Sequence, residues 1–374
     1  MNPALLRLAA ALFTWGLGEG IFFFFQPLYL AKLGADPLEI GQILGGVGIA
    51  MTIVHIPAGY LADKFGRRPL LRFSWLTGLL STIIMASVRT LPLFVAGLVL
   101  YSFTTFVISP LNSYVTAARG KWTVERALTL ISATFSLGMV SGPLIGGWLG
   151  DHYGLRSLYI AASVVFVIST IIIFSLPPQP LHDSAKQFSP RSLFQNKRYL
   201  GFLVLIFFVI FALYLPQPLT QNFLQEERNL SLGQIGLLGS LGGIGNVVLN
   251  LALGQMSAYA GFLLAQLSTA AFAFLIWRGS GMGLYGLAYI LLGGYRTTRS
   301  LAAAHVNSLI DDAQMGLAYG VTETVAMFPL ILAPPLAGYL YSIDPVAPLP
   351  FGVLLIFSGI ILTLFFFPRT RSAT

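Results

Sequence analysis

Four ionisable side chains lie inside long apolar segments of the sequence, where charge is costly. Glu19 lies near the middle of the first such segment, and Glu323 lies about two turns into the eleventh. Arg296 and Arg299 share the tenth segment and, three residues apart, occupy one face of a helix. An ionised group at the centre of a bilayer costs at least ~2.5 kcal/mol, so it normally faces an interior and has a partner. These four residues are the first candidates for chemistry.

Two kinds of chemistry fit these residues. Burial favours the neutral form of a carboxylic acid, whereas a nearby arginine favours the carboxylate. Glu19 and Glu323 are therefore proton-coupling candidates, provided that an arginine approaches in only one state. Paired arginines such as Arg296 and Arg299 suit carboxylates and phosphates. These two arginines and Glu19 are candidates for substrate binding. The structural alternatives are an ion pair between Glu19 and the arginines, and a packing or loop-pairing role for Glu323.

Other polar and aromatic residues extend the set of substrate-binding candidates. They lie in or beside apolar segments and are Asn112, Tyr101, Tyr295, Gln217 and Trp15. No catalytic residue, cofactor or metal site is predicted. The glycine clusters lack the glycine-lysine-serine ending of a phosphate loop, and the four histidines lack metal-ligand spacing.

The composition predicts what must position these residues. Of 374 residues, 56% are hydrophobic and 9% charged, with a mean hydropathy of +0.80, whereas soluble domains carry about 25% charged residues. A helix that spans a bilayer needs about 20 apolar residues. The sequence therefore predicts an all-α membrane protein with twelve transmembrane helices, at residues 5–31, 38–62, 69–88, 91–117, 125–149, 156–176, 199–224, 232–256, 260–277, 281–303, 315–341 and 347–367.

The distribution of basic residues predicts the orientation. With the N-terminus inside, fourteen of the 21 lysines and arginines fall in cytoplasmic segments and five in outer loops, as the positive-inside rule favours. Both termini are thus expected in the cytoplasm. The net charge of +8 does not indicate a nucleic-acid partner, because the positive charges sit in short gaps between apolar runs.

An internal repeat predicts two halves. The segment QPLYLAKLGADPLEIGQI from Gln26 matches QPLTQNFLQEERNLSLGQI from Gln217, and GPLIGGWL from Gly142 matches APPLAGYL from Ala333. Both matches are offset by 191 residues. The sequence therefore predicts two pseudo-symmetric six-helix bundles, at 1–176 and 199–374, joined by a proline-containing cytoplasmic linker at 177–198.

A charged motif lies between the second and third predicted spans. Its residues are Gly59, Asp63, Lys64, Gly66, Arg67 and Arg68. This pattern resembles the signature loop of the major facilitator superfamily (MFS), and with the duplication the resemblance covers the whole chain. It implies the MFS fold and a conformational latch in this loop. The arginines also suit anionic lipid and topology.

A second motif in the fifth span comprises Gly138, Gly142, Pro143, Gly146 and Gly147. It resembles the glycine-proline motif of the family's drug/proton antiporters, although it is also compatible with plain small-residue helix packing. The arginine that many proton-coupled exporters carry in the fourth span is absent from this sequence.

The resemblance implies a secondary active transporter of a small organic solute, working by alternating access in a prokaryotic cytoplasmic (inner) membrane. Proton-coupled efflux of a drug or metabolite by a monomer is expected, with substrate, protons and membrane lipid as partners. The alternatives are import or exchange of an anionic solute bound by Arg296 and Arg299, transport of an amphiphile or lipid, and a sensor without transport. The resemblance gives no indication of an enzyme.

Overall fold

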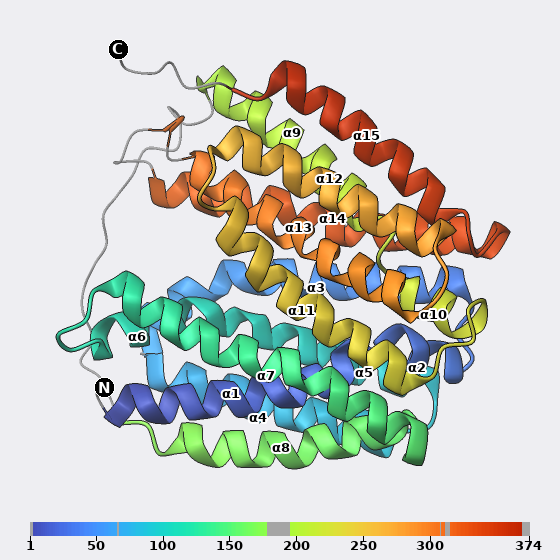
Figure 1. The fold of residues 1–374 in the computed structure, drawn as a ribbon. Helices are drawn as coiled ribbons and strands as arrows, with labels where there is room; N and C mark the ends of the chain where they lie inside the picture. Colours follow the sequence, from blue (N-terminus) through green and yellow to red (C-terminus); the bar gives the residue numbers. More distant parts are fainter. Residues whose placement is uncertain (1–2, 66, 178–194, 307, 311–314, 369–374) are drawn as a thin grey trace. The chain divides into compact units, whose positions relative to one another are not determined.

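A computed structural model describes residues 3–65, 67–177, 195–306, 308–310 and 315–368, without the side chains of 55–65, 109, 125 and 315–317. Every regular element in this described part is helical (Figure 1). The elements are α1 Pro3–Phe23, α2 Gln26–Lys32, α3 Pro37–Phe65, α4 Arg67–Ser87, α5 Leu91–Ser102, the 3₁₀ helix η1 Phe103–Val107, α6 Ile108–Ala118, α7 Val124–Tyr153, α8 Arg156–Phe174, α9 Lys197–Tyr214, α10 Thr220–Glu226, α11 Leu232–Leu253, α12 Ala258–Arg278, α13 Met282–Val306, α14 Met315–Ile343 and α15 Pro348–Phe366.

These helices confirm the all-α membrane fold. Among the described residues, eleven helical stretches are long and apolar enough to cross a membrane. They do not include α13, whose 25 residues carry Arg296 and Arg299 and are correspondingly less apolar. Helices form here because a backbone in lipid must satisfy its own hydrogen bonds.

Two of the predicted spans are interrupted, which corrects the sequence-based boundaries. The span at 5–31 divides into α1 and α2, and the span at 199–224 divides into α9 and α10. Proline explains the first break, because Pro27 has no N–H to donate to the preceding turn. The second break contains Pro216 and Pro218. Both breaks fall at the repeated Gln-Pro pair, so the duplication extends to local backbone structure.

The fourth predicted span, at 91–117, is also not one α-helix. It runs through α5, then the 3₁₀ helix η1, then α6. Pro110 lies one turn after η1 and cannot donate to the carbonyl of Phe106. The hydroxyls of Thr104 and Thr105 donate to the carbonyls of Tyr101 and Ser102, at 2.7 and 2.9 Å, which accompanies the tightened turn.

The chain folds into two compact units. Unit 1 comprises Met1–Ala35, Gly46–Ser184 and Leu224–Ser240, and unit 2 comprises Asp36–Gly45, Ala185–Phe223 and Leu241–Thr374. The start of α3 therefore belongs to unit 2, and the first half of α11 belongs to unit 1. Two of the changes of unit occur within a helix beside a glycine pair, which is Gly45–Gly46 in α3 and Gly242–Gly243 in α11. Most of the predicted linker, residues 178–194, lies outside the described residues.

In unit 1, α1 packs against α7 and α8, and α4 packs against α5 and α8 (Figure 1). A buried polar chain joins three of these helices. The indole N–H of Trp75 donates to the Ser169 hydroxyl at 2.8 Å, and Ser169 donates to the carbonyl of Ala11 at 2.6 Å. Each polar group of this chain thereby has a hydrogen-bond partner, which fixes how the three helices pack.

In unit 2, α9 packs against α14 and α15, and α12 packs against α13 and α15. The core centres on the apolar face of α9, where Phe202, Ile206 and Val209 are fully buried. The Tyr199 hydroxyl donates to the carbonyl of Ala318 on α14 at 2.8 Å. The start of α9 is thus fixed against the helix that carries Glu323.

Candidate functional site: the carboxylate of α1 and the arginines of α13

Glu19 lies in α1 and is held by two donors in unit 1. The Tyr101 hydroxyl donates to Glu19 Oε2 at 3.0 Å, and the Trp15 indole N–H donates to the same oxygen at 3.2 Å. Trp15 lies one helical turn before Glu19, and Tyr101 comes from α5. Both donors are buried, whereas Glu19 is partly exposed. Hydrogen bonds to an ionised acceptor are the stronger kind, so these two donors can hold an ionised Glu19 side chain in a fixed orientation.

Aromatic rings surround these donors. Trp15 stacks on Phe166 with ring centroids 4.2 Å apart, and Phe22 meets Tyr101 edge-on at 5.3 Å. Gly78 leaves the space into which the Trp15 indole fits, since a Cβ there would meet that ring. The arrangement is a carboxylate at the edge of an aromatic cluster. Such a site can bind a proton or an organic cation, because carboxylates and ring faces both attract positive charge.

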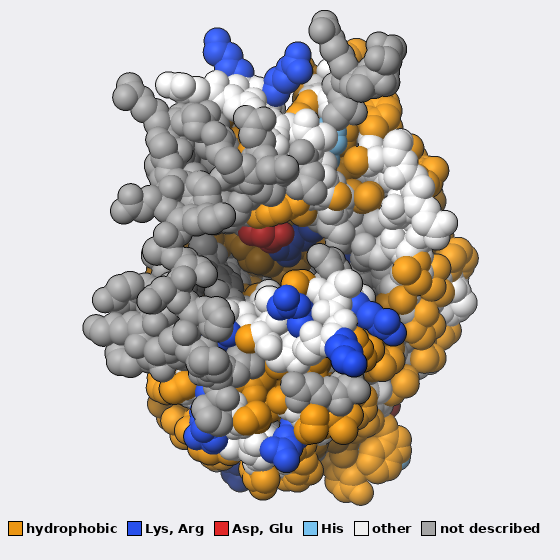
Figure 2. Space-filling model, turned by 90° about the vertical axis from the view of Figure 1, so that its left-hand side faces the viewer, with side chains coloured by type: hydrophobic (Ala, Val, Ile, Leu, Met, Phe, Trp, Pro, Cys, Tyr) orange, Lys and Arg blue, Asp and Glu red, His pale blue; other side chains and the backbone are white. Residues whose placement is uncertain are grey.

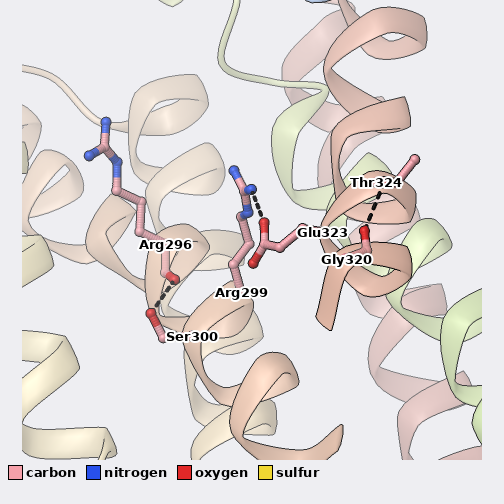
Figure 3. A network of polar contacts seen from close by, with 6 residues as sticks. All are labelled: Arg296, Arg299, Ser300, Gly320, Glu323 and Thr324. Atoms are coloured by element: carbon pink, nitrogen blue, oxygen red, sulfur yellow. Dashed lines mark hydrogen bonds and ion pairs between the residues drawn. The ribbon is translucent and has the colours of Figure 1, made fainter. Parts of the chain in front are cut away.

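A second charged group lies in unit 2, where Arg299 of α13 pairs with Glu323 of α14 (Figure 3). Arg299 Nη2 and Glu323 Oε2 are 3.0 Å apart, and their side chains are 22% and 53% exposed. Arg296 is exposed, and Figure 3 shows its guanidinium directed away from Glu323. The two arginines therefore differ in role, since only Arg299 has a carboxylate partner among the described side chains.

Tyr295 lies one turn before Arg299 and is buried. Its ring stacks on Tyr214 of α9 with centroids 5.6 Å apart. The structure thus brings together three of the predicted residues in unit 2, namely Tyr295, Arg299 and Glu323. In unit 1 it brings together Glu19, Tyr101 and Trp15. The predicted approach of Glu19 to the arginines stays a prediction, because they belong to different units.

Two substrate-binding candidates join neither group by a described contact. Asn112 lies exposed on α6, where its carbonyl accepts a hydrogen bond from Thr116. Gln217 lies in the break between α9 and α10 and donates from Nε2 to the carbonyl of Leu213 at 2.7 Å. A role for these two residues rests on the sequence alone.

The predicted latch falls largely outside the described residues. Gly66 and the side chains of Asp63 and Lys64 lie outside them. Gly59 lies in α3, and Arg67 and Arg68 begin α4 and are partly buried. In the first turns of α4, Arg72 Nη2 donates to the carbonyl of Phe174 at 2.5 Å. The latch role of this loop stays a prediction.

The glycine motif of α7 makes close contacts between helix backbones. A Cβ at Gly138, Gly142 or Gly146 would meet backbone atoms of α1, and at Gly142 it would lie 2.5 Å from Gly20 Cα. A Cβ at Gly147 would lie 2.9 Å from the Cα of Gly233 in α11. The motif therefore packs α7 onto α1 along one face and onto the first half of α11 at its end.

Asp151 is a residue that sequence reasoning missed. It lies in the last turn of α7, and its carboxylate accepts hydrogen bonds from the backbone N–H groups of Leu232 and Gly233, both at 2.8 Å. The Ser231 hydroxyl donates to Asp151 Oδ2 at 3.0 Å. Ser231 and Gln234 form a capping box at the same helix start. The capping-box residues Ser231 and Gln234 and the nearby glycine motif were the sequence signals that could have indicated this contact.

Comparison with known proteins places these features in a wider context. The profile of the family described as Major Facilitator Superfamily matches residues 8–327. Multidrug resistance protein 1 of Bacillus subtilis (strain 168) is 21% identical, over 97% of this chain and 96% of that protein. An uncharacterized MFS-type transporter of Methanocaldococcus jannaschii is 29% identical over 43% of this chain, and the match spans 42% of that protein. A crystal structure of the nucleoside transporter NupG shares the fold, with a TM-score of 0.82 at 16% identity over 98% of each chain.

Proposed function

Because the chain belongs to the major facilitator superfamily and is a multi-pass membrane transporter of that family, we propose that it exports small organic solutes, lipophilic cations in particular, in exchange for protons. The observation that carries this proposal is the environment of Glu19. A partly exposed carboxylate, held by Trp15 and Tyr101, lies at the edge of an aromatic cluster. The name of the B. subtilis relative, a multidrug resistance protein, supports the same direction of transport.

The proposed mechanism is competition for one carboxylate. When Glu19 is ionised, its negative charge and the neighbouring rings attract an organic cation. When Glu19 takes up a proton, that attraction is lost and the cation dissociates. If the two events occur on opposite sides of the membrane, proton entry drives cation exit by alternating access. Trp15 and Tyr101 keep the carboxylate oriented in both states.

The alternative substrate is an anion bound by the arginines of α13, and the exposure of Arg296 favours it. Arg299 argues against it, because Glu323 already neutralises that guanidinium. One uncommitted arginine is a weaker anion site than a pair. A thermal-shift screen distinguishes the two: stabilisation by lipophilic cations supports export through Glu19, and stabilisation by organic anions alone supports the alternative.

The proposed orientation has both termini in the cytoplasm. Basic residues are concentrated at the starts of α4, α7 and α9, which all lie on the side predicted to be cytoplasmic. Figure 2 shows one side of the molecule, on which several Lys and Arg side chains of the described residues appear. Cytoplasmic loops of membrane proteins carry such an excess of lysine and arginine.

The decisive test is transport by Glu19→Gln in vesicles with an imposed pH gradient. Glutamine keeps an acceptor oxygen for Trp15 and Tyr101 but cannot ionise, so we expect gradient-driven accumulation of a fluorescent lipophilic cation to fall to background. Glu323→Gln is the matched control, because it removes one carboxylate from the other unit. Concentrative transport by Glu19→Gln would contradict the proposal, and loss only in Glu323→Gln would move the coupling role to that residue.

A further inference from the structure

A cleft of about 910 Å³ lies in unit 2 between α9 and α15. Its walls come from the first three turns of α9, the last turns of α15 and the segment that follows α13. The lining residues are Lys197, Arg198, Gly201, Val204, Leu205, Phe208, Ser308, Leu309, Leu362, Phe366 and Pro368. Its volume is in the range of small-molecule sites. None of its residues belongs to the charged groups described above.

The cleft follows one face of α9. Lys197, Gly201, Val204 and Phe208 recur every three or four residues, and they span about 16 Å at the rise of an α-helix. This length is about half the ~30 Å thickness of the hydrocarbon core. A Cβ at Gly201 would meet no atom within 4 Å, so the wall is open at this glycine.

The cleft is amphipathic along its length. Both basic side chains, Lys197 and Arg198, line the end at which α9 begins, and both are exposed. Neither has a carboxylate partner among the described side chains. The other walls are mainly apolar, and Val204 and Phe366 are 70% and 67% exposed. Apolar side chains this exposed on a membrane-spanning helix face lipid.

We propose that this cleft is a binding site for an anionic phospholipid, distinct from the transport site. The phosphate lies at Lys197 and Arg198, where basic side chains at a helix start attract negative charge. An acyl chain lies along Gly201, Val204 and Phe208. With the proposed orientation, the basic end is in the cytoplasmic leaflet, where anionic lipids supply such headgroups.

The location of the charges favours an anionic phospholipid over a water-soluble solute or a zwitterionic lipid. A water-soluble solute would leave the exposed apolar wall in contact with water, whereas an acyl chain covers it. A zwitterionic lipid fits the apolar wall equally well but gains less from two positive charges. The site therefore favours a lipid with a negatively charged headgroup, which binds at the end where α9 begins.

The test measures lipids retained by the purified transporter, using native mass spectrometry after extraction from vesicles of equal phosphatidylglycerol and phosphatidylethanolamine. We expect the unmodified protein to retain phosphatidylglycerol preferentially. The double variant Lys197→Gln/Arg198→Gln should weaken its binding about thirtyfold, the effect of two basic residues at a membrane surface. The matched control, Lys121→Gln/Arg126→Gln, removes two exposed basic residues at the start of α7 and should leave retention unchanged.

A second variant tests the apolar wall. Gly201→Leu places an apolar side chain in the cleft, and its Cβ would meet no atom within 4 Å. Leucine is also a better helix former than glycine, so the protein should fold normally. It should also lose the retained lipid, whereas Gly283→Leu, at an equally open glycine in α13, should not.

Four outcomes would overturn the proposal. Equal retention of both lipids would indicate annular lipid only. Unchanged retention in both cleft variants would place the lipid elsewhere. Absence of retained lipid in the unmodified protein would indicate that the chain itself covers the cleft. Displacement of the lipid by millimolar inorganic phosphate would likewise contradict it, by showing a site for phosphate without an acyl chain.

Discussion

Asp151 holds the first half of α11 against α7, and its removal should release that contact. The carboxylate accepts two backbone hydrogen bonds of 2.8 Å at the helix start and one of 3.0 Å from Ser231. A capping side chain contributes about 1 kcal/mol, and a negative charge at a helix N-terminus adds about 0.3–1 kcal/mol. Asp151→Ala should therefore cost about 2 kcal/mol, which raises the population of the detached state about thirtyfold. Asp151→Asn keeps one acceptor oxygen, so we expect the population of the detached state to rise only about fivefold.

The assay is cysteine labelling, for which the chain is suited because it contains no cysteine. Ser240 is 3% exposed, and its hydroxyl donates to the carbonyl of Val140 on α7 at 2.6 Å. Ser240→Cys is a small change that reacts only when α11 separates from α7. The labelling rate should follow the population of the detached state when closing is faster than labelling.

Asp344 supplies the control. It follows α14 in the second half, and its carboxylate accepts a hydrogen bond from Val346 within its own loop, at 2.9 Å. Asp344→Ala removes the same charge from the loop that follows α14 and should leave Ser240→Cys labelling unchanged. Equal labelling rates in the Asp151 and Asp344 variants would refute the reasoning, because α11 would then be held by apolar packing alone.

Two further predictions concern packing and the ion pair. Gly142→Ala should destabilise the protein by about 1–3 kcal/mol, because the added Cβ would lie 2.5 Å from Gly20. Thermal unfolding in detergent measures this change in stability. The control is Gly320→Ala, which has open space around it and should be neutral or stabilising. Arg299→Gln should cost at most about 1 kcal/mol, because its partner Glu323 is 53% exposed. The reversed pair Arg299→Glu/Glu323→Arg should restore the lost stability. If it does not, Arg299 stabilises the protein through contacts other than its pair with Glu323.

The architecture could be predicted from the sequence because membrane solvent imposes simple rules. Spans follow from runs of apolar residues, and the repeat is visible in the sequence letters themselves. The breaks at Gln26 and Gln217 were not predicted, because hydropathy continues through them and only the adjacent prolines mark the change. The packing of Gly142 against α1 could be anticipated as close contact, but its partner helix could not.

The candidate charges were also found from the sequence, whereas their partners were not. Glu19, Arg299 and Glu323 stand out because charges are rare in apolar segments. The pairing of Arg299 with Glu323 depends on how two successive helices face each other, which spacing does not determine. The contacts of Asp151 join residues about 80 positions apart, so they depend on topology.

The starts of α3 and α11 show two ways of supplying a carboxylate to a helix N-terminus. In α3 the carboxylates belong to the helix start itself: Glu39 N–H donates to Asp36 Oδ1 at 2.8 Å, and Asp36 N–H donates to Glu39 Oε2 at 3.1 Å. In α11 the capping box of Ser231 is uncharged, and the charge comes from Asp151 on another helix. A carboxylate within the same turn stabilises only that turn. A carboxylate on a neighbouring helix makes the stability of the turn depend on the contact between the two helices. The carboxylate at the start of α11 can therefore form and break a contact between helices, whereas those at the start of α3 cannot.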